Sequence, residues 1–258
     1  MPYKLSPSSM STLKDCPRCF WLAINKKISP PAGIFPSLPS GMDAVLKKHF
    51  DACRKKGSIP EELKGTGARL VSNTDLQKVW KSDFKGTRWH FNTVLNKDTA
   101  QQEPKAADAK LFKDVDLLNI WRSNFKGIRW QDKKGNELHG AVDEILVKNG
   151  KLIVLDFKTR GFPCKDDTHK HYQDQMDIYN FLLRKNGYET EDYAYLLFFH
   201  PTAVTKTGDF AFERTLKKVE INVKNAEKIF TSAIKCLEGP MPKPGKDCEV
   251  CEFVRERT

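Results

Sequence analysis

The chain contains 258 residues, enough to bury a sizeable hydrophobic core in one domain with a smaller appendage. Lysine and arginine number 44 against 33 acidic residues, and the net charge of +11 favours polyanions such as nucleic acids as partners. No apolar run approaches the length of a membrane-spanning helix and no signal peptide is visible, so we expect a cytoplasmic protein without a membrane span.

The N-terminal part of the chain is predicted to be mainly helical. Ser6 is a good N-cap, and the proline that follows it suits the first helical position of a helix extending over residues 7–24. Residues 29–41 are rich in Pro, Ser and Gly and predict a loop. Met42–Lys56 is an amphipathic pattern that predicts a second helix, which Gly57 ends.

A ten-residue unit occurs twice in the chain. Residues 80–89 recur as residues 121–130, 41 residues later, with seven of ten positions identical in the pattern W-x-S-x-F-K-G-x-R-W. Tryptophan and phenylalanine at such spacing favour packing, while stacking on a single-stranded nucleic acid is the alternative. Residues 97–110 are polar and alanine-rich and predict an exposed linker, so we interpret residues 60–110 as a variable helical insertion.

The most informative segment is a predicted β-hairpin. Its strands are Leu138–Val147 and Lys151–Phe157, and Asn149-Gly150 between them is a strong turn signal because both residues tolerate positive φ. A surface hairpin with a charged outer face is the alternative. The run Ile153–Leu155 argues for burial, since it is continuously apolar instead of alternating.

Charged side chains converge on this hairpin. Asp156 and Lys158 lie on one face of the second strand, and Asp143 can lie across from Asp156 on the first. Buried carboxylates need partners, so this group predicts a metal ion between them. Glu144 should point to the opposite face and is interpreted as a bystander.

The C-terminal half continues the pattern of a mixed α/β domain. A helix containing Gln175 and Tyr179, four residues apart and therefore on one face, precedes a strand at Tyr193–Phe199. This order predicts a right-handed crossover and a parallel strand pair. Phe210–Val223 predicts one or two further strands, and Ala226–Leu237 a helix.

Cysteine provides a second signal, because four of the seven cysteines form two C-x-x-C pairs near the chain ends. These are Cys16 and Cys19, and Cys248 and Cys251. The spacing is typical of metal ligands, with zinc and an iron–sulfur cluster both open, and favours a shared centre over unrelated buried thiols. Disulfides are a poorer explanation in an intracellular compartment. The other three cysteines are expected to be core or incidental thiols.

The hairpin motif followed by Gln-x-x-x-Tyr resembles the PD-(D/E)XK nuclease superfamily. More narrowly, Asp143, Asp156-x-Lys158 and Gln175-x-x-x-Tyr179 in this order resemble the RecB-like branch, which includes the CRISPR-associated adaptation nucleases. The resemblance covers roughly residues 1–60 and 110–258, and implies a single nuclease domain over residues 1–258. The implied fold is a restriction-endonuclease-like α/β core, a mixed central sheet flanked by helices, with a helical N-terminal region and a terminal metal-cluster staple.

The resemblance also implies ligands and roles. Asp143, Asp156 and the backbone carbonyl of Phe157 would bind Mg2+ or Mn2+, and Lys158 would orient or help deprotonate a water or stabilise the developing oxyanion. Gln175 and Tyr179 would position the nucleophile or contact the DNA backbone. His49, on the predicted early helix, is a further candidate metal ligand.

For the terminal cysteines the resemblance implies a 4Fe-4S cluster that joins the chain ends. The commoner family pattern has one N-terminal and three C-terminal cysteines, whereas this chain has two and two, so zinc stays open as the alternative.

The resulting hypothesis is a metal-dependent DNA nuclease acting on single strands or duplex ends in repair, recombination or defence. A catalytically silent nucleic-acid-binding module with a structural zinc site is the alternative. The complete set of Asp143, Asp156, Lys158, Gln175 and Tyr179 argues against it, because a binding module has no need for that constellation.

Overall fold

The computed structural model describes residues 2–31, 33, 35–79 and 116–255. The first copy of the repeat and the predicted linker over residues 97–110 lie outside the described residues. Among the helices that are described, none is both long and apolar enough to cross a membrane.

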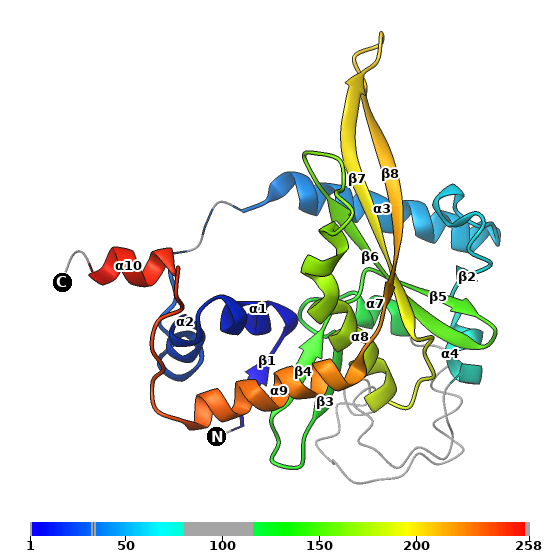
Figure 1. Ribbon diagram of the computed structural model, residues 1–258. Coiled ribbons are helices and arrows are strands. Elements are labelled where there is room, and N and C mark those ends of the chain that lie inside the picture. The colour runs from blue at the N-terminus through cyan, green and yellow to red at the C-terminus, as the bar shows by residue number, and fades with distance from the viewer. Residues whose placement is uncertain (1, 32, 34, 80–115, 256–258) are drawn as a thin grey trace.

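A five-stranded mixed sheet forms the centre of the molecule (Figure 1). Its strand order is β2-β5-β6-β7-β8, and the parallel pair is β6 with β7, as the predicted crossover requires. The strands are β2 (Arg69–Leu70), β5 (Glu144–Lys148), β6 (Lys151–Thr159), β7 (Tyr193–Val204) and β8 (Phe210–Glu220). This mixed sheet with flanking helices confirms the predicted fold class.

The hairpin between β5 and β6 turns at Asn149 and Gly150, which both have positive φ (49° and 76°), as predicted. The strand predicted over Leu138–Val147 is wrong, because the chain divides it between two sheets. Its first part is β4 (Glu137–Gly140), in a three-stranded sheet of order β1-β4-β3. At the division, a Cβ on Gly140 would lie 2.7 Å from Cε1 of Tyr179, so the close approach of α8 requires glycine. The other two strands of this sheet are β1 (Lys4–Leu5) and β3 (Ile128–Gln131).

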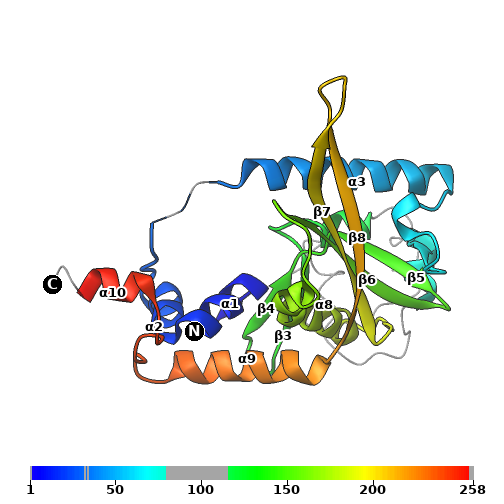
Figure 2. The ribbon, with the colours of Figure 1, turned by 45° about the horizontal axis from the view of Figure 1, so that its top comes forward.

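Helices cover both faces of the central sheet (Figure 2). On one face lies α3 (Ser37–Lys56), whose fully buried Phe50 packs against Phe157 of β6 with ring centroids 5.0 Å apart. On the other face lies α8 (Gln173–Lys185), with α9 (Val223–Glu238) packed beside it. Alternate residues of β6 therefore enter two separate hydrophobic clusters.

The N-terminal helix begins as predicted but ends early. Ser6 caps α1 (Pro7–Asp15) with a capping box, in which its hydroxyl accepts the Ser9 N–H at 3.3 Å. Cys16 is extended, because the following proline disfavours helix at the preceding residue, and the chain then restarts as α2 (Pro17–Trp21). The prediction of one helix over residues 7–24 is therefore wrong.

The second helix begins earlier than predicted and ends where expected. α3 starts at Ser37, inside the segment 29–41 that was predicted as loop. Its C-cap, Gly57, has a φ of 65°, which is the left-handed conformation that ends many helices at glycine. The remaining helical segments are η1 (Leu22–Lys26), η2 (Glu61–Leu63), α4 (Asn73–Val79), α7 (Leu117–Trp121), η3 (Thr168–Tyr172) and α10 (Glu249–Arg255).

The second copy of the repeat contributes to the core. Trp121 is fully buried, with its ring 5.0 Å from that of Tyr188. Trp130 packs edge-on against Phe181 and Phe230, at centroid distances of 5.2 and 5.3 Å. Both tryptophans of this copy therefore act as packing residues.

A buried ion network joins α3 and the C-terminal end of α7 to the β5–β6 hairpin. Glu144, interpreted above as a bystander, is fully buried and accepts 2.6 Å hydrogen bonds from Arg54 and Arg122. Arg122 also contacts Asp51 and donates to the backbone carbonyl of Asp143 at 2.9 Å. Glu144 therefore lies on the face opposite Asp156, as predicted, and there anchors the hairpin to the helices.

Replacing Arg122 by methionine (Arg122→Met) should destabilise the protein by about 3 kcal/mol, because it leaves a buried carboxylate with one of its two cations. The matched control is Lys14→Met, which removes a lysine that is 71% exposed from its pair with Asp174 and should cost less than about 1 kcal/mol. Urea unfolding of both variants measures the difference, and equal losses would contradict a dominant role for the buried network.

Candidate active site and cysteine cluster

The sheet and α8 bring the five predicted catalytic residues together. Asp143 directly precedes β5, and because Glu144 pairs with Leu155, the register places Asp143 beside Asp156. Lys158 follows on the same face of β6. Gln175 and Tyr179 lie one turn apart on α8, which packs on that face.

These side chains form a continuous series of contacts. Asp143 Oδ2 accepts the N–H of Phe157 at 2.8 Å. Lys158 forms an ion pair with Asp156 and donates to Oε1 of Gln175 at 3.0 Å. The Gln175 amide in turn donates to the Tyr179 hydroxyl at 2.8 Å. Gln175 therefore fixes both the lysine and the tyrosine.

Burial sets the electrostatics of the centre. Asp156 is 2% exposed, and burial, followed by the nearby Asp143 carboxylate, raises its pKa to about 7 although Lys158 opposes the shift. Burial also raises the pKa of Tyr179 well above its ordinary value, with a further contribution from both aspartates. Tyr179 is therefore a neutral hydrogen-bonding group at physiological pH.

The residues fit a hard divalent cation. The buried Oδ2 of Asp156 accepts no hydrogen bond from the described residues, although Lys158 lies close enough for an ion pair. Carboxylate oxygens from Asp143 and Asp156 are the donors that Mg2+ and Mn2+ prefer. Phe157, whose carbonyl is the remaining predicted ligand, lies between Asp156 and Lys158 on β6.

His49 is not brought to this group. Its Nε2 lies 3.4 Å from Oε2 of Glu62, and its side chain is 45% exposed. Instead, Lys47 of the same helix reaches Oδ1 of Asp143 at 3.1 Å and Asp43 at 2.8 Å. Residues two apart on a helix differ by about 200° in direction, so Lys47 and His49 cannot both face the hairpin. The i,i+4 spacing of Asp43 and Lys47 is the sequence signal that could have predicted their ion pair on the helix.

Tyr172 is a further neighbour that sequence patterns did not identify. The Lys158 ammonium lies 4.6 Å from the centroid of its ring, which allows a cation–π interaction. The same ring contacts Phe198 of β7, so the sheet holds it in place.

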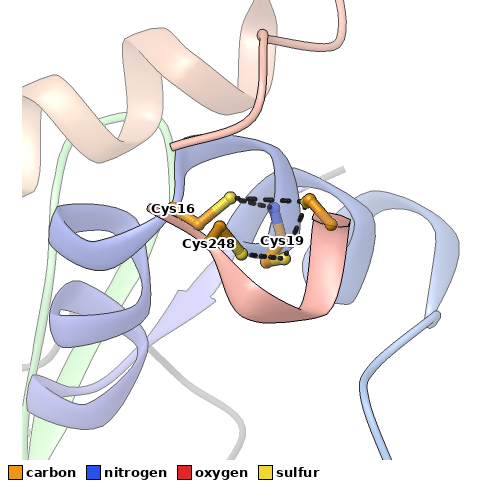
Figure 3. Close-up of side chains that lie close together, drawn as sticks. Cys16, Cys19 and Cys248 are labelled. Carbon is orange, nitrogen blue, oxygen red and sulfur yellow. Dashed lines mark hydrogen bonds between the residues drawn. The ribbon is translucent and has the colours of Figure 1, made fainter. Parts of the chain in front are cut away.

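The four terminal cysteines converge in one cluster, in which Figure 3 labels Cys16, Cys19 and Cys248. All four sulfur atoms lie within 4.8 Å of one another, and no other such group of potential metal ligands occurs in the described part of the chain. Individual Sγ–Sγ distances are 3.8 Å for Cys16–Cys251, 3.6 Å for Cys19–Cys248 and 3.5 Å for Cys19–Cys251.

The local backbone explains why this cluster forms. Cys16 occupies the break between α1 and α2, where its sulfur accepts the N–H of Cys19 at 3.5 Å and that of Gly245 at 3.2 Å. A Cβ on Gly245 would lie 2.4 Å from the carbonyl oxygen of Asp15, so only glycine lets the C-terminal segment approach this closely. Burial raises the pKa of Cys16, but the hydrogen bonds from the Gly245 and Cys19 N–H groups, together with those from the neighbouring thiols of Cys248 and Cys19, lower it to about 6.

A family model of the PD-(D/E)XK nuclease superfamily matches residues 4–255. The chain belongs to this superfamily. The match spans both the β5–β6 hairpin and the two cysteine pairs, but the superfamily assignment does not by itself account for the cysteine cluster. No curated protein matches the sequence. One solved structure, described as "Crystal structure of SSO0001", aligns at 16% identity over 83% of this chain and 94% of that chain, with a TM-score of 0.30.

The raised pKa of Asp156 predicts a pH-dependent stability. A carboxyl group with an ordinary pKa of 3.8 that rises to about 7 on folding contributes stability below pH 3.8, and this contribution is lost as pH rises through about 7. In the presence of chelator, the free energy of unfolding of Asp156→Asn minus that of the parent protein should therefore be larger at pH 8 than at pH 4, by more than ~1 kcal/mol. Chemical unfolding at both pH values measures the trend, and a pH-independent difference would contradict it.

Proposed function

We propose that this protein is a divalent-metal-dependent deoxyribonuclease that acts on single strands or duplex ends. The observation that carries the proposal is the connected series Asp143, Asp156, Lys158, Gln175 and Tyr179 in a protein of the PD-(D/E)XK nuclease superfamily. The net charge of +11 supports a polyanionic substrate.

Each residue has a chemical role in this proposal. Asp143 and Asp156 would hold Mg2+ or Mn2+, which supplies Lewis acidity toward a water and the substrate phosphate. Lys158 carries the ammonium group that orients the attacking water or stabilises the developing oxyanion. Gln175 positions that ammonium through its carbonyl oxygen and positions the Tyr179 hydroxyl through its amide.

Asp156→Ala and Lys158→Ala should each abolish metal-dependent cleavage while the fold is retained. The aspartate variant should also lose metal binding, whereas the lysine variant should keep it because Lys158 is not a ligand. Cleavage of labelled single- and double-stranded DNA with Mg2+, with Mn2+ and with chelator is the measurement.

Matched controls come from exposed residues of the same sheet. Lys151→Ala removes a lysine at the start of β6, and Asp209→Ala removes an aspartate beside the β7–β8 turn. Both should cleave like the parent protein. Undiminished cleavage by Asp156→Ala, in preparations free of contaminating nuclease, would overturn the assignment.

We also propose that Cys16, Cys19, Cys248 and Cys251 bind one metal centre. The family resemblance implies a 4Fe-4S cluster, in which each thiolate binds a separate iron. One observation favours zinc: sulfurs at about 2.3 Å from a single tetrahedral ion are separated by roughly 3.8 Å, and the three separations given above are 3.5–3.8 Å.

Replacing any one of the four cysteines by serine should remove the metal and lower the midpoint of unfolding, because the centre closes a very long loop of chain. Cys53→Ser, outside the cluster, should change neither. Metal analysis of protein purified without oxygen distinguishes a 4Fe-4S cluster from a single zinc ion. Brown protein with about four irons per chain supports the cluster, and colourless protein with one zinc supports the single ion. Protein that contains neither metal would contradict the proposal.

A further inference from the structure

The arginine that directly follows β6 has a side chain without a partner in the described part of the protein. Every other arginine whose side chain the structure describes donates to a carbonyl or pairs with a carboxylate. The Nε atom of Arg160 is buried and has no hydrogen-bond acceptor among the described residues. Buried donors are nearly always paired in folded proteins, so this one points to an acceptor supplied by a ligand.

Arg160 lies on the active-site side of the sheet. Its N–H donates to the carbonyl of Phe199 at 2.8 Å, so the pairing of β6 with β7 continues past the end of β6. Alternation along the chain places Arg160 on the same face as Lys158, about 7 Å further along. A strand of nucleic acid bound at Lys158 therefore passes within reach of this guanidinium.

A second cation approaches from β8, which lies beyond β7 in the same sheet (Figure 1). Lys217 pairs with Leu196, which pairs with Asp156, so all three lie on one face. Burial raises the pKa of the Cys164 thiol, and the positive charges of Arg160 and Lys217 oppose that rise, so both cations lie near one sulfur atom. Cys164 packs against the hydrophobic cluster on the α8 side, which is the side of the active site.

The loop that begins at Arg160 also exposes an aromatic ring. Phe162 is 79% exposed. Exposure of a phenylalanine to water is unfavourable, whereas the face of any nucleic-acid base can stack on its ring. A cation for the phosphate and a ring for the base, two residues apart, are the two parts of a site for a single strand. The bases inside a duplex are not accessible to such a ring.

We propose that the loop between β6 and η3, residues 160–167, is a single-strand binding element of the active site. Arg160 and Lys217 bind a backbone phosphate of the substrate strand next to the phosphate that is cleaved. Phe162 stacks on a base of the same strand. This role rests on the proposed function and narrows its substrate to DNA single strands.

The competing explanation is an exposed loop with no ligand. In that case replacing Arg160 changes only the net charge, as the loss of any other lysine or arginine would, and replacing Phe162 changes nothing. A single-strand binding element instead requires two different signatures. Loss of Arg160 should reduce the salt dependence of DNA binding, because a phosphate contact is lost. Loss of Phe162 should not, because stacking releases no counterions.

The experiment is binding of labelled oligothymidine DNA to the full chain in chelator, over a range of salt concentrations. Arg160→Met should weaken binding about tenfold and reduce the log–log salt slope by about 0.7, because one phosphate contact is lost. Lys217→Met should change both quantities in the same direction. Arg160→Lys should keep the slope of the parent protein, because it keeps the charge. Phe162→Ala should weaken binding about tenfold with the slope unchanged.

Matched controls remove the same groups elsewhere. Lys151→Met removes an exposed lysine at the other end of β6, and Phe210→Ala removes a phenylalanine that is 70% exposed at the start of β8. Both should bind oligothymidine like the parent protein. Thermal unfolding shows whether each variant is folded, and Arg160→Met should unfold at no lower temperature than the parent, because it removes an unpaired buried donor.

A relaxed closed-circular duplex, which has no ends, tests the preference for single strands. Phe162→Ala should bind this duplex like the parent protein. Equal weakening on the circle and on oligothymidine would overturn the stacking role. A parental salt slope in folded Arg160→Met would overturn the phosphate role.

Cleavage assays with Mg2+ and Mn2+ distinguish a failure of this element from a failure of the proposed function. If the parent protein cleaves oligothymidine while Arg160→Met and Phe162→Ala bind it like the parent, only the binding element is wrong. If both variants lose affinity with the expected signatures while the parent cleaves no DNA, the proposed function is wrong and the binding element is retained.

Discussion

One hairpin carries acidic side chains into both faces of the central sheet, and the surrounding helices must satisfy them. Glu144 is fully buried on the α3 side, and Asp156 is 2% exposed on the α8 side. An ionised carboxylate without partners in such a place costs several kcal/mol, so the packing of the hairpin depends on cations from elsewhere in the chain. Arg54 and Arg122 supply them on one face, and Lys158 on the other.

This requirement links stability to the geometry of the site. Arg122 binds the buried Glu144 and also the backbone carbonyl of Asp143. The network that stabilises the α3 face therefore also holds the backbone of Asp143 in its position beside Asp156. Hydrophobic packing alone would not fix the position of Asp143, because apolar contacts are not directional.

The terminal cysteine cluster is joined to the site through one helix. Trp21 and Arg18, beside the first cysteine pair, donate to the carbonyls of Gly239 and Pro242, which hold the C-terminal segment against α2. From the same region, Lys14 of α1 pairs with Asp174, next to Gln175 on α8. Helix α1 therefore contacts both the region of the cysteine cluster and the helix that carries Gln175.

The sequence by itself determined the features whose physical cause lies within a few residues. Asn149-Gly150 requires a tight hairpin, Gly57 ends a helix, and the order of Asp143, Asp156 and Lys158 places the charges on known sides of two strands. Tertiary structure decided the rest, because distant packing controls it. Phe50 against Phe157 sets the rotation of α3, which turns Lys47 toward Asp143 and His49 toward Glu62. Tyr179 likewise lies close to Gly140, at the point where the predicted first strand is divided between two sheets. The local sequence of neither segment predicts that contact.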